Sequence, residues 1–175
     1  GRAFLVSSYS TSYDFTLQSS TSAGRQFSPD VAMDSYGNFV VTWSGVGEGD
    51  QYGVYARVFD LNGVALCDEF LVNEYNINAQ SDPSVAMDAD GDIVITWSSF
   101  GQDGDSNSVY ARRYNILGQA VTGEIRVNTY TANLQQNSDV AMDDDGDFVV
   151  TWESYGQDGN SWGVYAQRFN AAGAK

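Results

Sequence analysis

A motif of 14 residues occurs three times along the chain, and it constrains the fold more than any other feature. The copies span residues 30–43, 84–97 and 139–152, and each begins its conserved part with Val-Ala-Met-Asp and ends with Thr-Trp. The closing tryptophans are 54 and 55 residues apart (97 − 43 and 152 − 97). A period of this size indicates a tandem repeat of one supersecondary unit.

Each repeat contains four short runs of β-forming residues separated by turn residues. In the second repeat these runs cover residues 69–73, 84–87, 93–97 and 109–114. The spacing suits antiparallel hairpins, and no stretch has a sustained helical period. The sequence therefore predicts an all-β chain built from three repeats of a four-stranded antiparallel unit. Together the repeats form a single domain over residues 14–175, divided into 14–67, 68–122 and 123–175.

The third and fourth runs predict how the units pack. The third run is apolar at nearly every position, as in residues 93–95, which is typical of a strand buried on both faces. The fourth run alternates, with Val54 and Ala56 on one face and Tyr55 and Arg57 on the other. This pattern favours blades of a β-propeller, although propellers usually contain about four to eight blades. Pairing with a second chain or a longer array would supply more blades, and a pseudo-threefold β-prism or β-trefoil is the alternative.

Residues 1–13 lie outside the repeats and read as a surplus N-terminal strand. Its apolar centre, Phe4, Leu5 and Val6, resembles the opening run of each repeat at residues 69–73. A spare strand and an unpaired sheet edge are what strand addition between subunits requires. The strand predicts either donation to another copy or closure of its own fold.

The turn inside the motif is acidic in two of its three copies. Alternate carboxylates around a glycine supply the oxygen ligands that Ca²⁺ prefers. The alternative is an ordinary hairpin turn, in which the first Asp accepts backbone N–H groups and Gly takes a positive φ. The first copy, residues 34–38, lacks the middle carboxylate and supports the turn. The candidate calcium ligands are Asp88, Asp90, Asp92, Asp143, Asp145 and Asp147.

The polar, glycine-rich loop that follows each motif is a candidate glycan site. Aromatic rings stack on the apolar face of a sugar, and carboxylates and amides bond its hydroxyl groups. The candidate glycan residues are Asp103, Asp158 and Trp162. The alternative is a solvated connection between strands. Trp43, Trp97 and Trp152 at the strand ends are interpreted as core residues.

Composition excludes several function classes. The formal net charge of −15 disfavours nucleic acid as a partner, because phosphate binding needs basic patches. The chain contains no histidine, which removes Ser-His-Asp chemistry and imidazole zinc sites. No apolar run is long enough for membrane insertion. The acids recur symmetrically in turns, whereas an active site is normally asymmetric, so we expect no enzymatic activity.

The repeat as a whole resembles a tandem repeat of about 55 residues found in very large secreted or surface proteins of aquatic bacteria. The resemblance rests on Val-Ala-Met-Asp-x-Asp-Gly-Asp-Phe-Val-Val-Thr-Trp followed by Gly-Val-Tyr-Ala-Gln-Arg-Phe-Asn, and it covers residues 14–175. It implies an extracellular setting and a structural or adhesive role, with calcium as a candidate cofactor. Partners would be the chain itself or a cell-surface glycan or protein. A self-assembling filament subunit and a lectin are the alternative functions.

Overall fold

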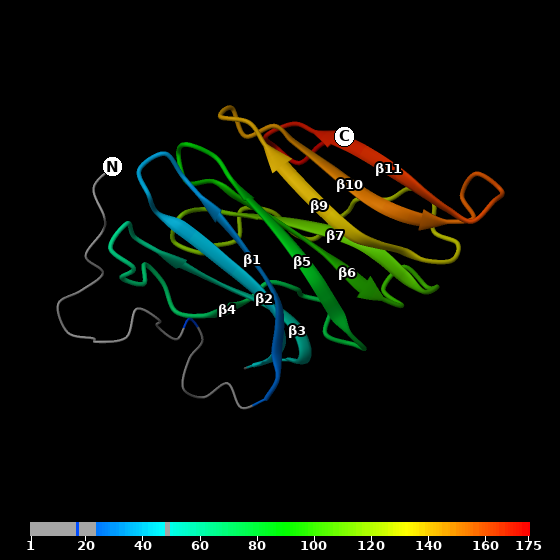
Figure 1. Cartoon of the computed structure of the whole chain (residues 1–175), viewed down its shortest axis with the longest axis horizontal. Coiled ribbons are helices and arrows are strands. Elements are labelled where there is room, and N and C mark those ends of the chain that lie inside the picture. The colour runs from blue at the N-terminus through cyan, green and yellow to red at the C-terminus, as the bar shows by residue number, and fades with distance from the viewer. Residues whose placement is uncertain (1–16, 18–23, 48–49) are drawn as a thin grey trace.

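The computed structural model describes Leu17, residues 24–47 and residues 50–175 (Figure 1). The predicted surplus strand, with Phe4, Leu5 and Val6, lies outside these residues, so its role stays a prediction. No helix in the part of the chain that the structure describes is long and apolar enough to cross a membrane.

The described chain forms three antiparallel sheets that follow one another along the sequence. The first sheet contains β1 (Gln26–Met33), β2 (Phe39–Gly47), β3 (Asp50–Phe59) and β4 (Phe70–Leu71). The second contains β5 (Gln80–Met87), β6 (Ile93–Phe100), β7 (Asn107–Tyr114) and β8 (Ile125–Arg126). The third contains β9 (Gln135–Met142), β10 (Phe148–Tyr155) and β11 (Trp162–Phe169). The all-β prediction is confirmed.

The opening run of each repeat lies in the sheet before it. Strand β4 belongs by sequence to the second repeat, yet Leu71 pairs with Tyr55 on β3 of the first sheet. Strand β8 of the third repeat pairs with β7 in the same way, through Arg126 and Tyr110. Sheet boundaries are therefore displaced from repeat boundaries by one strand, and the opening strand of the second and third repeats connects its repeat to the preceding sheet.

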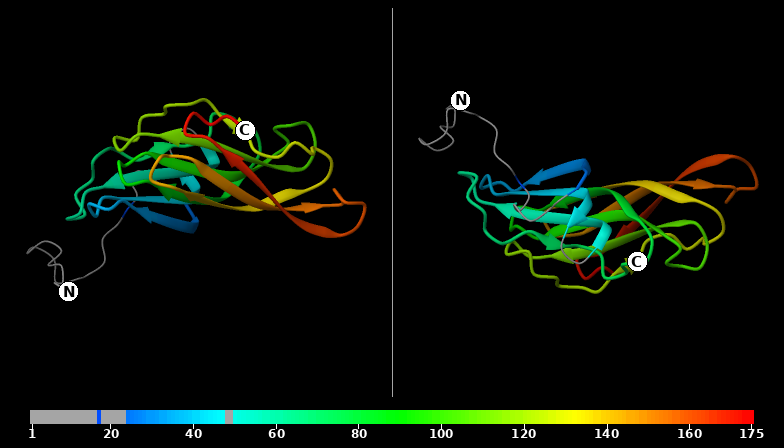
Figure 2. Two further views of the ribbon diagram at one scale, coloured as in Figure 1. Left: turned by 90° about the horizontal axis from the view of Figure 1, so that it is seen from above. Right: turned by 90° about the horizontal axis from the view of Figure 1, so that it is seen from below.

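The sheets stack as propeller-like blades in an open row, with the first and third at opposite ends (Figures 1 and 2). Val31 on the first sheet is 59% exposed and Val164 on the third is 80% exposed. These two sheet faces therefore do not cover each other, as a closed threefold arrangement would require. A pseudo-threefold β-prism or β-trefoil would give the three sheets the same surroundings, whereas among the described residues only the second sheet packs between two others.

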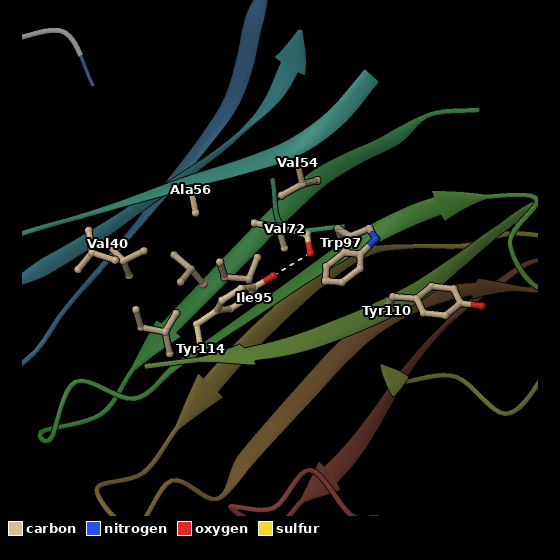
Figure 3. Packing of buried hydrophobic residues seen from close by; sticks show 11 residues of the cluster. Val40, Val54, Ala56, Val72, Ile95, Trp97, Tyr110 and Tyr114 are labelled. Carbon is tan, nitrogen blue, oxygen red and sulfur yellow. Dashed lines mark hydrogen bonds between the residues drawn. The ribbon is translucent and has the colours of Figure 1, made fainter. Parts of the chain in front are cut away.

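Two apolar clusters fill the spaces between neighbouring sheets. One joins the first and second sheets around Val54, Ile95 and Trp97, and Figure 3 shows this packing. The other joins the second and third sheets around Val109 and Trp152. The predicted double burial of the third run is confirmed for β6, which contributes Ile95 to one cluster and Val94 to the other. It is wrong for β10 at the end of the stack, where Val149 is 38% exposed. The tryptophans of all three motifs are core residues, as predicted.

A buried asparagine fixes the segment that runs from one sheet to the next. Asn128 Oδ1 accepts the backbone N–H of Val109 at 2.8 Å, and its Nδ2 donates to the carbonyl of Tyr130 at 2.8 Å and to Gln135 Oε1 at 3.2 Å. Asn73 makes the equivalent bonds with Val54 and with Gln80. Buried polar groups need such partners, so these amides determine where the connecting segments lie.

Candidate functional site

Two kinds of connection lie at opposite ends of the strands. Because the strands are antiparallel, the motif turns after β1, β5 and β9 lie at one end, and the loops after β2, β6 and β10 lie at the other. The calcium prediction concerns the first end, and the glycan prediction concerns the second.

The first Asp of each acidic turn closes the hairpin. Asp88 Oδ1 accepts the backbone N–H groups of Asp90 at 3.0 Å and Asp92 at 2.8 Å. Asp143 Oδ1 accepts the equivalent groups of Asp145 and Asp147 at 3.1 and 3.0 Å. Asp34 in the non-acidic first copy makes the same bonds, so this geometry needs no metal. Burial is the largest influence on the Asp88 carboxyl and raises its pKa above the ordinary value.

The last Asp of each acidic turn pairs with an arginine of the same sheet. Asp92 Oδ2 lies 3.0 Å from Arg113, and Asp147 Oδ2 lies 3.1 Å from Arg168. Among the residues that the structure describes, no group of three or more Asp, Glu or Cys side chains is arranged to hold a metal ion. The structure thus gives the first and last carboxylates of each turn other partners, and calcium binding stays a prediction centred on Asp90 and Asp145.

The candidate glycan aspartates also shape their own loops. Asp103 Oδ1 accepts the backbone N–H of Asp105 at 3.3 Å, and Asp158 Oδ1 accepts that of Asn160 at 3.1 Å. The two side chains differ in their second oxygen. Asp103 Oδ2 is buried with no hydrogen-bond partner in the described chain, whereas Asp158 is exposed. Asp158 is therefore the better placed of the two to meet a ligand.

The third sheet ends in an exposed aromatic pair, which we call the Tyr155–Trp162 platform. The two residues face each other across β10 and β11, with ring centroids 5.3 Å apart and planes at 64°. Tyr155 is 43% exposed and Trp162 is 45% exposed, so both rings present faces or edges to water. The hairpin that carries them extends beyond the neighbouring loops (Figure 1). Asp158 and Asn160 lie in its loop, beside the rings in sequence.

The equivalent loop of the second sheet makes hydrogen bonds to other segments of the same chain. Gln102 Nε2 donates to the carboxylate of Glu124, and Asp105 Oδ2 accepts the backbone N–H of Asn133 at 2.8 Å. Phe100 is exposed but faces Asn107 across the strands rather than an aromatic residue. The structure therefore brings Asp158 and Trp162 into one loop and places Asp103 in another.

The partnership of Tyr155 with Trp162 was missed at the level of sequence. The signal that could have found it is that the two aromatic residues flank the hairpin loop, which makes them direct neighbours across the strands. Arg113 was also missed, although its buried side chain donates to the carbonyl of Ala171 in the neighbouring sheet. Its counterpart in the first repeat is Val58, so no repeated pattern marks the position.

No model of a protein family matches the sequence, and no curated protein matches it. Several solved structures have a similar fold. An endo-arabinase from Bacteroides thetaiotaomicron is 17% identical with a TM-score of 0.54, over 90% of this chain and 61% of that chain. A protein of unknown function from Dyadobacter fermentans is 10% identical with a TM-score of 0.61, over 89% of this chain and 54% of that chain. This chain thus spans less than two thirds of either structure, and the likeness shows the fold alone.

A fucose lectin from Kordia zhangzhouensis, solved in complex with methyl-fucoside, is also similar. It is 16% identical with a TM-score of 0.39, over 78% of this chain and 96% of that chain. At this level of similarity the sugar in that structure has no bearing on the residues of this chain.

Proposed function

We propose that this chain is a non-catalytic extracellular module that binds neutral glycans and serves an adhesive or structural role. The observation that carries the proposal is the Tyr155–Trp162 platform, an exposed aromatic pair at the tip of a hairpin. Exposed aromatic groups gathered at one place on a surface mark interaction sites. The C–H face of a pyranose ring is apolar and packs on such rings.

Polar groups beside the platform supply the second part of sugar recognition. Asp158 is exposed, with one oxygen held by the N–H of Asn160, so its carboxylate is oriented before a ligand arrives. A pre-oriented acceptor binds a hydroxyl group at a lower entropic cost than a mobile one. The carboxylate and the net charge of −15 repel acidic sugars, which is why the proposal is limited to neutral glycans.

The carboxylates at the turns support a non-catalytic role. Glycoside hydrolysis usually needs two carboxyl groups flanking one bond, with different environments. In this chain Asp88 and Asp143 hold equivalent turns, and Asp92 and Asp147 form equivalent ion pairs. Groups that repeat in this way have one structural task and do not divide into an acid and a base.

Glycan-array screening of the intact chain, followed by titration of the best neutral ligand, tests the proposal. Trp162→Ala should weaken binding by about tenfold or more, since an aromatic contact contributes about 1 kcal/mol beyond its buried area. Phe100→Ala is the matched control, because Phe100 is the exposed counterpart of Tyr155 on the second sheet and has no aromatic partner opposite. An array without neutral ligands, or equal losses in the two variants, would contradict the proposal.

A further inference from the structure

The interface between the first and second sheets joins two faces of different composition. The second sheet presents an aromatic face, which carries Ile95, Trp97 and Tyr110. The first sheet meets it with an aliphatic face, which carries Val54 and Ala56 (Figure 3). Large rings on one face thus fill the space above small aliphatic side chains on the other.

The interface between the second and third sheets repeats this arrangement. Here the second sheet supplies the aliphatic face, with Val109 and Ala111, and the third supplies the aromatic face, with Val150 and Trp152. Every sheet therefore has one aromatic and one aliphatic face, and the two kinds fit each other twice in the same molecule.

In the part of the chain that the structure describes, one face of each kind is left open at the ends of the stack. On the third sheet Val164 is 80% exposed, whereas its counterpart Val109 is fully buried. On the first sheet Val31 is 59% exposed and Met33 is 61% exposed, whereas Val85, the counterpart of Val31, is buried. The open faces thus resemble the two types that pack together inside the chain, with one difference: Glu153 stands opposite Val164, where the internal faces have Ser44 opposite Val54 and Ser98 opposite Val109.

The open end of the third sheet also retains the polar contact used inside the stack. In the second sheet Arg113 binds Asp92 and reaches across to the carbonyl of Ala171 on the third. Arg168 holds the same position in the third sheet and binds Asp147 in the same way, but its side chain is 72% exposed. A groove of about 330 Å³ lies beside it, and Arg168, Asp147 and the open-face valine Val149 are among its lining residues.

On the open face of the first sheet, Leu17 lies where a connecting segment lies in the internal interface between the first and second sheets. Within the stack, Arg112 donates to the carbonyl of Val72, which lies between the first and second sheets. In the first sheet Arg57 donates to the carbonyl of Leu17 at 3.2 Å, and Leu17 packs against the cluster that contains Trp43 and Tyr55. Leu17 is placed as Val72 is, so the aromatic face of the first sheet is arranged as one side of a sheet–sheet interface.

We propose that a second copy of this chain docks head to tail, with the aliphatic face of the third sheet against the aromatic face of the first sheet of the second copy. The turn containing Leu61 enters the groove, where Arg168 donates to the Leu61 carbonyl, because Leu61 occupies in the first sheet the turn position of Ala171. Unlike faces make a heterologous contact, which closes into a ring or continues as a filament. Two copies contain six sheets, within the range of about four to eight blades found in propellers.

Sedimentation velocity of the intact chain over a range of concentrations tests the proposal. We expect association that strengthens with added salt, because each copy carries a net charge of −15. Val164→Asp and Val31→Asp should each weaken association by about 100-fold or more, because each buries an unpaired charge in the contact. Arg168→Glu should weaken it as well. Val121→Asp, at an exposed valine on the outer edge of the second sheet, is the matched control.

Mixing the two valine variants tests the polarity of the contact. The Val164→Asp chain keeps an intact first-sheet face, and the Val31→Asp chain keeps an intact third-sheet face. A mixture should therefore form a one-to-one dimer, although neither variant dimerises alone. The circular dichroism of both should match the unmodified chain, since both valines are exposed. A monomeric unmodified chain at all concentrations and salt levels, or a mixture that stays monomeric, would overturn the proposal.

Discussion

The valine at the start of the fourth run offers a controlled test of how the sheets are stacked. Val54, Val109 and Val164 occupy the same position of β3, β7 and β11, and each is paired with the central strand of its sheet. Because the strand position is shared, the intrinsic β preference lost on replacement with alanine is about equal at all three. The first two are fully buried, and the third is 80% exposed. Differences in stability among the variants therefore measure burial between sheets.

The expected losses follow from the area removed from the core. Val→Ala removes two methyl-sized groups at about 0.8 kcal/mol each, or about 1.6 kcal/mol, when the site is fully buried. A residual cavity brings the loss of unfolding free energy to about 2–3 kcal/mol for Val109→Ala and for Val54→Ala. Because Val164 is 80% exposed, only about one fifth of this free energy of burial applies to it. Val164→Ala should therefore lower the free energy of unfolding by about 0.3 kcal/mol.

Urea unfolding followed by tryptophan fluorescence at submicromolar concentration measures these values in the monomer. Far-UV circular dichroism should give the same urea midpoint, because neighbouring sheets share their apolar cores and unfold together. Separate midpoints would show that the sheets unfold one at a time. A loss at Val164 equal to that at Val109 would refute the open third sheet. It would also remove the basis for docking a second copy there.

Three further predictions concern single side chains. Asn128→Ala should lower the free energy of unfolding by about 3 kcal/mol in urea titrations, because it leaves two buried polar groups and one part-buried carbonyl without their partner. Asn160→Ala should cost less than about 0.5 kcal/mol. Burial, with a smaller contribution from the nearby acid Asp50, raises the pKa of Tyr55 from 10.0 to about 12, so its contribution to stability is present below pH 10 and is lost as pH rises towards 12. Tyr55→Phe should flatten that decline in the urea midpoint. In thermal melting with chelator, Asp143→Ala should lower stability by about 1 kcal/mol and Asp145→Ala by less than about 0.5 kcal/mol. A loss of stability in Asp145→Ala that appears only when calcium is present would establish an ion at this turn.

The packing of the sheets could be predicted from sequence because burial follows side-chain pattern. Apolar runs such as residues 93–95 showed which strand is buried on both faces, and the alternation of Val54 with Tyr55 separated the two kinds of face. The path of the chain between sheets could not be predicted. Whether Leu71 pairs with its own repeat or the preceding one depends on contacts far apart in sequence, and the local residues suit either sheet.

An irregularity in the pairing of the first strand of each sheet could also not be predicted from local patterns. Ser28, Asp82 and Asn137 all have positive φ, of 50°, 53° and 54°, at the points where the pairing of β1, β5 and β9 shifts. Three different residue types share this conformation, so it is imposed by the sheet and its neighbours. Ser28 Oγ donates to Asp82 Oδ1 at 3.0 Å, which joins the irregularities of adjacent sheets.

Only part of the candidate site could be predicted from the sequence, because the same residue types form turns and bind ligands. Asp103 and Asp158 sit in equivalent loops and both bond their own backbone, so sequence could not tell which is free to meet a ligand. The structure separates them through exposure and through Trp162, which faces Tyr155 in the third sheet. That difference arises from the register of a hairpin and not from the aspartates.

Comparison of the three copies therefore distinguishes residues that build a blade from residues that are available for binding. Positions that match in all copies, such as the first Asp of each turn and the closing Trp, are engaged in hydrogen bonds or buried in the core. Positions that differ behave otherwise. Where the third copy has Trp162, the earlier copies have Asn107 and Tyr52. Where it has exposed Arg168, the second has buried Arg113. Binding of a glycan is expected where the repeat symmetry is broken, as at Trp162, whereas binding of a second copy is expected at repeated positions such as Val164 that the end of the stack leaves exposed.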